Sequence, residues 1–400
     1  MNWDLIALVI FYGLLLLIFL IYRKKFVVQS KIFVLYKTKI GLKLMDRVAK
    51  YCPKFMRFLG YIGVVVGFGG MAFIFYFLVK ETFKFVIKVS PNPPLAPVLP
   101  GVPIAGAPQL HLGFWHWIIA IFLVALVHEF SHGLFARVHK IKVTNSGFAF
   151  LGPILAAFVE PDEEQLKKAG LKKQLTVYAA GPYANFIFAV LFLLLLNLVS
   201  GPLFFNLLEP NGVVVSAFVP GYPMEKLNVS LPFTINEVNG VKTPSLEKFS
   251  HAMSKIKAGD KVAIKAGNDT IHVTAAENPA NKSKGFIGVT GFSENYKVKD
   301  KYSYIKPFVG AFLWINKLLL WLFIINLGVG LFNLLPIGPV DGGRMFYATL
   351  LHYFSKTKAK RIFSAVSLFI LLLIFINILP YLGKLVAYLA KGASFILSLI

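Results

Sequence analysis

The chain has 400 residues, of which 57% are hydrophobic and only 15% are charged, and its formal net charge is +24. Soluble domains are about 45–50% apolar, so the composition favours a membrane protein. The Lys and Arg residues flank apolar blocks and do not form one basic face with interleaved aromatic residues, so we expect no nucleic-acid partner. The single cysteine, Cys52, excludes an intrachain disulfide and any zinc site built from several cysteines.

Six apolar blocks follow one another along the chain, each close to the roughly 20 residues that cross a bilayer as a helix. They cover residues 5–22, 59–78, 114–138, 174–198, 308–336 and 362–380. The stretch 381–400 carries Lys384 and Lys391 and is either a seventh span or a helix lying in the membrane interface. The predicted fold class is a polytopic α-helical membrane protein with about six spans, embedded in the lipid bilayer of the cell membrane.

The loop between the first two spans sets the predicted orientation. Between Arg23 and Arg57 it holds eleven Lys and Arg residues and one acid, Asp46. Cytoplasmic loops carry such an excess of positive charge, so we expect this loop inside and the N-terminus outside the cell. The third span then runs from outside to inside.

Two segments between the spans predict structure of other kinds. Segment 146–159 is apolar but too short to span, with Gly and Pro in its middle, and we predict a re-entrant hairpin. From Gly212 to about Gly291, strand-like runs alternate with turn signals such as Asn239–Gly240. With a short helix over Ser245–Ile256, this region predicts a small α+β module inserted between two spans, outside the membrane.

The third span contains the sequence HEFSH, from His128 to His132. Residues four apart lie on one face of a helix, so both imidazoles can reach one metal ion, and neutral imidazole suits Zn²⁺. In this pattern Glu129 is the base that takes a proton from water. Ordinary polar residues in a helix are the alternative, but ionisable residues inside a span are costly, about 2.5–3.5 kcal/mol for an Asp at the helix centre on insertion scales, which favours a bound metal. Counted along the helix, the motif lies nearer the cytoplasmic face.

Two further motifs offer candidate partners for this helix. Asp341, in NLLPIGPVDGG, is the best candidate for a third zinc ligand, although it would also fit a loop aspartate just outside the membrane. The fourth span opens with AAGPYAN, in which Gly181 and Pro182 indicate a kink or a close helix contact. Asn185 is explained equally well by a hydrogen bond between helices and by a role towards the substrate.

The motifs HEFSH, GPYAN and PVDGG, in this order, resemble those of the site-2 protease family of intramembrane metalloproteases, over about residues 112–380. The inserted module resembles a PDZ domain in GVVVSAFVPGYP, INEVNG, SLEKFSHAM and GDKVAIKAG, although it lacks an obvious GLGF-type loop for binding a carboxylate. The resemblance implies membrane protein substrates, and an edge strand from a region like 147–158 that pairs with an unwound substrate.

The resemblance also implies roles for single residues. It makes His128, His132 and Asp341 the Zn²⁺ ligands and Glu129 the general base. Asn185 would hold the substrate strand or the developing oxyanion. We assign four further residues to substrate binding: Gly181, Pro182, Asn333 and Pro336.

These expectations divide the chain into five parts. They are the N-terminal spans with their loops (1–111), the first half of the protease core (112–200), the PDZ-like extracytoplasmic domain (201–305), the second half of the core with its aspartate (306–350) and the C-terminal span or spans (351–400).

Two other functions compete with proteolysis. A catalytically inactive membrane scaffold or receptor would act through the PDZ-like domain. A metal transporter would need polar ligands on several spans, whereas the sequence predicts one compact site.

Overall fold

The computed structural model describes residues 3–23, 26–29, 33–100, 112–151, 154–227, 229–279 and 281–397. The chain divides into two compact units. The insert covers Leu196–Asn316, and a helical unit contains the rest of the described chain on either side of it. Each unit is described by itself.

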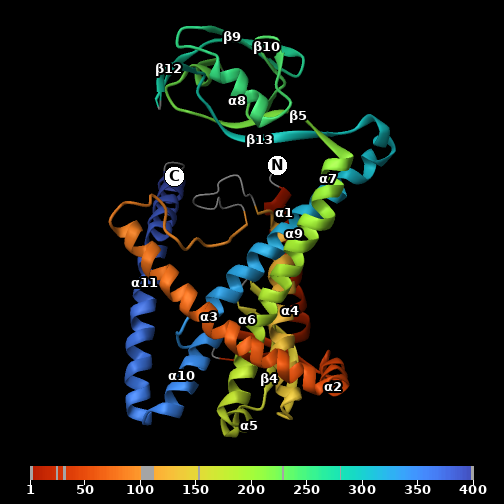
Figure 1. The fold of residues 1–400 in the computed structure, drawn as a ribbon, viewed down its shortest axis with the longest axis vertical. Coiled ribbons are helices and arrows are strands. Elements are labelled where there is room, and N and C mark those ends of the chain that lie inside the picture. The colour runs from red at the N-terminus through yellow and green to blue at the C-terminus, as the bar shows by residue number, and fades with distance from the viewer. Residues whose placement is uncertain are drawn as a thin grey trace. The chain divides into compact units, whose positions relative to one another are not determined.

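Helices make up most of the helical unit (Figure 1). Their bounds are α1 Trp3–Tyr22, α2 Leu42–Tyr51, α3 Pro53–Val86, α4 Phe114–Val138, α5 Glu163–Lys168, α6 Leu171–Leu194, α9 Lys306–Asn333 (shared with the insert), α10 Asp341–Tyr353 and α11 Lys356–Leu397. Within the described residues, five helices are long and apolar enough to cross a membrane, and they match the predicted second to sixth spans, except that the fifth ends at Asn333, before the predicted 336. The predicted first span is also helical, as the shorter apolar stretch Ile6–Tyr22.

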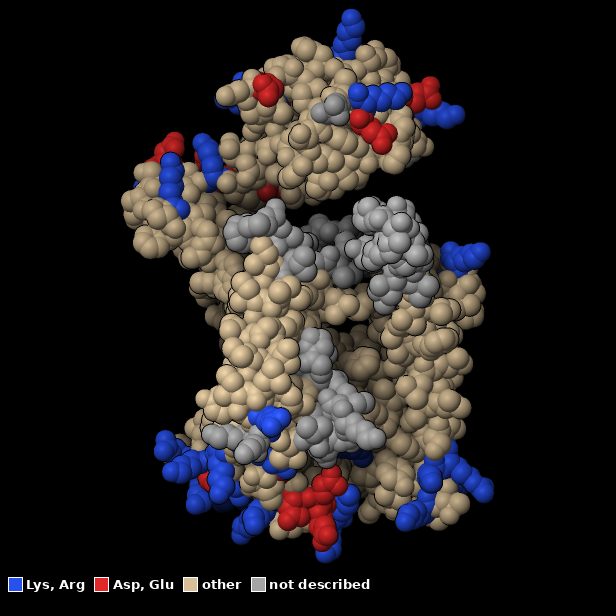
Figure 2. Space-filling view, turned by 180° about the vertical axis from the view of Figure 1, so that it is seen from behind, with Lys and Arg blue, Asp and Glu red and all other residues tan. Residues whose placement is uncertain are grey.

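The surface of the helical unit has the charge distribution of a membrane protein. On the face seen in Figure 2, Lys, Arg, Asp and Glu side chains gather at one end, beside a broad band of uncharged surface. The first turns of α11 carry four exposed cations: Lys356, Lys358, Lys360 and Arg361. The uncharged band is the surface that lipid would cover. The stretch 381–397, predicted as a seventh span or an interfacial helix, continues α11 without interruption.

A four-stranded antiparallel sheet accompanies the helices. Its order is β1 (Phe26–Gln29), β2 (Phe33–Thr38), β3 (Val143–Leu151) and β4 (Ile154–Pro161). The hairpin predicted at 146–159 is therefore a pair of regular strands, β3 and β4, and the loop after the first span supplies two more strands that we did not predict. Among the described strands β4 pairs only with β3, so it is an edge strand.

Helix α3 packs closely against α6 and the other helices around it. Glycines at every third or fourth position face its neighbours, where added Cβ atoms would press against side chains of α4, α6, α10 and the turn after α9: Gly60, Gly63, Gly67 and Gly70. A buried hydrogen bond of 2.7 Å from Asn377 Nδ2 to Thr82 Oγ1 ties α11 to the same helix. Small residues let helix backbones approach closely, and polar pairs of this kind join helices in lipid.

The insert is a small α+β domain, as predicted. Its strands are β5 Leu208–Phe218, β6 Phe233–Ile235, β7 Glu237–Val238, β8 Val241–Lys242, β9 Lys261–Ala266, β10 Asp269–Thr274, β11 Ala276–Asn278, β12 Asn281–Phe286 and β13 Val289–Val298, joined by α8 (Leu246–Ser254) and flanked by α7 (Gly201–Leu207). They form sheets ordered β13-β5-β6, β10-β9-β7-β8 and β11-β12. The hydroxyl of Ser245 accepts a hydrogen bond from Lys248 N and caps α8. Fully buried side chains, among them Val213, Met224 and Ile264, give the insert its own core.

Candidate metal centre and active site

Helix α4 and the start of α10 bring three candidate ligand atoms together. His128 and His132 are one turn apart on α4, and Asp341 is the first residue of α10. Asp341 Oδ2 lies 3.0 Å from His128 Nε2 and 3.2 Å from His132 Nε2, and the two Nε2 atoms are 3.2 Å apart. All three side chains are buried. They form the one group of three or more His, Cys, Asp and Glu side chains, among the described residues, that could hold a metal ion.

The geometry of this triangle fits zinc. Tetrahedral bonds of about 2.0–2.2 Å place ligand atoms about 3.3–3.6 Å apart, slightly more than the distances found here. Two imidazoles and a carboxylate are also a known catalytic donor set for Zn²⁺. Gly181 of α6 keeps the space open, because an added Cβ would lie 2.5 Å from His132 Nε2 and 2.6 Å from His128 Nε2.

Both imidazoles have a partner on their far side. His132 Nδ1 lies 2.7 Å from the carbonyl oxygen of Val177 on α6. Since a carbonyl only accepts, Nδ1 carries the proton and Nε2 is left as a lone pair facing the other two ligand atoms. His128 Nδ1 lies 3.0 Å from Asn185 Nδ2, one helical turn further along α6 than Gly181. Such outer partners orient ligand histidines in metal sites.

The carboxylate of Glu129 lies beside the cluster and contacts the edge strand. A cavity of about 230 Å³ is lined by Glu129, the three candidate ligands and Val159 of β4. Val159 N donates a hydrogen bond of 3.3 Å to Glu129 Oε2. The amide of Val159 therefore points to the side of β4 away from β3, where a further strand could pair.

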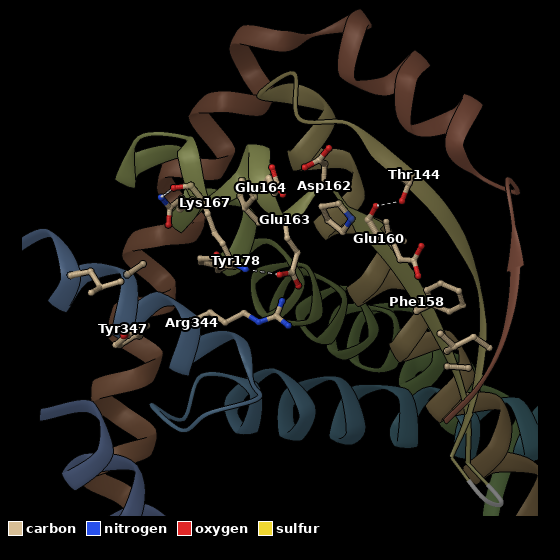
Figure 3. Close-up of a pocket in the computed structure, with 18 of the residues that line it drawn as sticks. Thr144, Phe158, Glu160, Asp162, Glu163, Glu164, Lys167, Tyr178, Arg344 and Tyr347 are labelled. Carbon is tan, nitrogen blue, oxygen red and sulfur yellow. Dashed lines mark hydrogen bonds and ion pairs between the residues drawn. The ribbon is translucent and has the colours of Figure 1, made fainter. Parts of the chain in front are cut away.

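A larger groove of about 1250 Å³ adjoins this cavity and shares Val159, Tyr178 and Arg344 with it. Arg344 of α10 points towards Glu163 of α5 across the groove (Figure 3). A hydrogen bond and ion pair with Lys167, 2.7 Å away, hold the pKa of Glu163 below its usual value. The groove combines apolar walls with a rim of both charges, which suits an extended peptide leaving the cavity.

The residues assigned to substrate binding occupy different places. Asn333 lines the 230 Å³ cavity. Gly181 lies against the two imidazoles. Pro182 and Pro336 are buried and are not among the residues that line the cavity. The carbonyl of Pro336 accepts a hydrogen bond from Ser367 of α11.

The sequence did not predict two backbone groups and two side chains of this site. The carbonyl of Val177 and the amide of Val159 are backbone atoms, which any residue type supplies, so no pattern of side chains could indicate them. Tyr178 and Arg344, which line both cavities, were also missed. The signal that could have found Arg344 is its spacing, one helical turn after Asp341.

Comparison with known proteins agrees with this geometry. The sequence model of peptidase family M50 matches residues 116–375, which include every residue of the cluster. An uncharacterized protein of Methanocaldococcus jannaschii is 30% identical over 325 residues, covering 79% of this chain and 77% of the relative. The chain therefore belongs to peptidase family M50, the site-2 protease family of zinc-dependent intramembrane metalloproteases.

Proposed function

We propose that this chain is a zinc endopeptidase that hydrolyses peptide bonds within or near the transmembrane segments of membrane proteins. The observation that carries the proposal is the buried convergence of His128, His132 and Asp341, with ligand atoms 3.0–3.2 Å apart, beside the carboxylate of Glu129. Three protein ligands leave one position open, which distinguishes catalytic from structural zinc sites.

Glu129 is the proposed general base. Zinc held by the three ligands would supply Lewis-acid activation of water and of the scissile carbonyl. Glu129 lines the same cavity, where it would take a proton from the attacking water and deliver it to the leaving amine. The hydrogen bond from Val159 N keeps its carboxylate on the side of the cavity next to β4.

The free edge of β4 is the proposed docking site for the substrate backbone. The N–H and C=O groups of a transmembrane helix bond to one another, so its peptide bonds become accessible only after unwinding. An unwound segment can regain hydrogen bonds by adding to an edge strand. Val159 is both on that edge and in contact with Glu129, so a strand added there would present its backbone to the proposed base.

We also propose that the insert is a PDZ-like domain outside the cytoplasm. A cavity of about 450 Å³ lies between α8 and the strand region 284–289, lined by Phe249, Met253 and Phe286 among others, and supports a peptide-binding role. The exposed cations at the start of α11 favour a cytoplasmic location for that end of the helical unit, with the N-terminus outside.

The Glu129→Gln variant tests the proposed function. We expect it to retain one zinc per chain, measured by mass spectrometry of the metal, and to cleave a membrane-spanning test substrate in proteoliposomes about 10²–10⁴-fold more slowly. Glu277→Gln, an exposed glutamate on β11 of the insert that lines none of the cavities described above, is the matched control and should cleave at the wild-type rate. Unreduced cleavage by Glu129→Gln would refute the assignment, and a metal-free but functional wild type would favour the scaffold.

A further inference from the structure

Asn185 has two features that its present hydrogen bond leaves unexplained. The residue is 0% exposed, and its Oδ1 has no hydrogen-bond partner within the described part of the chain. Its Nδ2 faces His128 Nδ1 at 3.0 Å. A buried polar atom without a partner is unfavourable, so native structures rarely keep one.

The imidazole of His132 already has the hydrogen bond that a histidine ligand needs at its Nδ1. His132 Nδ1 faces a carbonyl oxygen, so its proton is on Nδ1 and Nε2 is free to bind a cation. His128 Nε2 faces the same cluster, so it too must offer a lone pair when a metal is bound. His128 Nδ1 then carries a proton and needs an acceptor, which an NH₂ group cannot provide.

Rotating the side-chain amide of Asn185 by half a turn gives its Oδ1 a partner and gives His128 Nδ1 an acceptor. The rotation exchanges Nδ2 and Oδ1 and places the unpartnered oxygen against His128 Nδ1. We propose that Asn185 is a positioning residue that accepts a hydrogen bond from His128 Nδ1 and so fixes the tautomer and ring orientation of this ligand. The inference rests on the proposed zinc site and deepens it.

The position of Asn185 separates this role from contact with the substrate. Asn185 is not among the residues that line the 230 Å³ cavity. It lies on the Nδ1 side of the imidazole, whereas the ligand cluster lies on the Nε2 side, so the ring stands between them. Its loss should therefore act on metal affinity first, and not on the binding of substrate or of an oxyanion.

The zinc dissociation constant of the full-length protein in detergent micelles, measured by competition with a chromophoric chelator, tests the proposal. Asn185→Leu keeps the size of the side chain and removes the acceptor, and we expect zinc binding to weaken about 10–100-fold. Asn185→Asp retains an acceptor and should bind zinc as tightly as the wild type. The matched control is Asn326→Leu, because Asn326 is a buried amide of α9 that bonds only to Leu322 O of its own helix among the described contacts.

Three outcomes would overturn the proposal. They are wild-type zinc affinity in Asn185→Leu with a reduced kcat, equal weakening in the Leu and Asp variants, and a zinc-loaded wild type whose ¹⁵N-histidine NMR spectrum shows no protonated Nδ1 on His128. The NMR measurement decides the question even if Asn185→Leu does not fold. His128→Ala tests the underlying site separately: if it binds zinc like the wild type, the proposed function fails, whatever Asn185 does.

Discussion

Gly181 is the residue of the GPYAN motif whose position allows the sharpest test. An added Cβ would lie within 2.6 Å of both Nε2 atoms, which are the ends of rings already held by Val177 and Asn185. We therefore expect Gly181→Ala to weaken zinc binding at least about 10-fold, by chelator competition. Gly170→Ala at the start of the same helix meets nothing within 4 Å and should bind zinc normally. Normal affinity in Gly181→Ala would mean that α6 is not packed this closely on the site.

At the scale of single residues, the sequence predicts side chains of the site better than their surroundings. His128 and His132 were predicted from the helical repeat, and the structure brings Asp341 to them across more than 200 residues of chain. The resemblance named Asn185, but only the packing of α6 shows that it faces Nδ1 of His128 and not the cavity. This distinction depends on which side of a ring a neighbour occupies, and no spacing along the chain contains that information.

At the scale of elements, His139 joins the end of α4 to α6. Its Nε2 lies 2.6 Å from Thr176 Oγ1, and burial, with the nearby charges of Lys173 and Arg57, lowers the pKa of His139 from 6.5 to about 4. Because the pKa of His139 is lower in the folded protein than in the unfolded chain, the neutral ring is favoured by folding. Its contribution to the free energy of unfolding is present above about pH 6.5 and is lost as the pH falls towards 4.

The expected loss in the free energy of unfolding from protonation of His139 is about 1–2 kcal/mol, after allowance for the partial exposure of the ring. Thermal midpoints in detergent, compared between about pH 7.5 and about pH 4.5, should fall more for the wild type than for His139→Gln. The comparison with the variant cancels the titration of the other histidines. Parallel pH profiles for the two proteins would contradict the assignment.

The elements themselves were predictable where their signal is local. Long apolar blocks predicted α3, α4, α6, α9 and α11 because the bilayer requires helices of that length. Strands β1 and β2, of four and six residues, lie in a highly charged loop and pair with each other, and β2 joins the sheet by pairing with β3, more than a hundred residues later. A short strand whose partner is so distant has no reliable local signature.

At the scale of the whole molecule, the two units have separate cores, and the three proposed zinc ligands all belong to one of them. His128, His132 and Asp341 come from α4 and α10 of the helical unit, whereas the insert is held by its own buried cluster around Val213 and Ile264. A ligand stabilises the part of a protein whose folding creates its site, by about 2.7 kcal/mol when free zinc is 100-fold above the dissociation constant. Removing zinc with a chelator should therefore destabilise the helical unit selectively.

Hydrogen exchange of the full-length protein, with zinc and after chelation, measures this selectivity. We expect amides of α4, α6 and α10 to lose protection on chelation, while those of β5, β9 and β13 keep theirs. The Asp341→Asn variant should resemble the chelated wild type in both units, because it weakens the site without touching the insert. Equal loss of protection in both units would instead show that they unfold together, and the insert would then have to be treated as part of the catalytic unit.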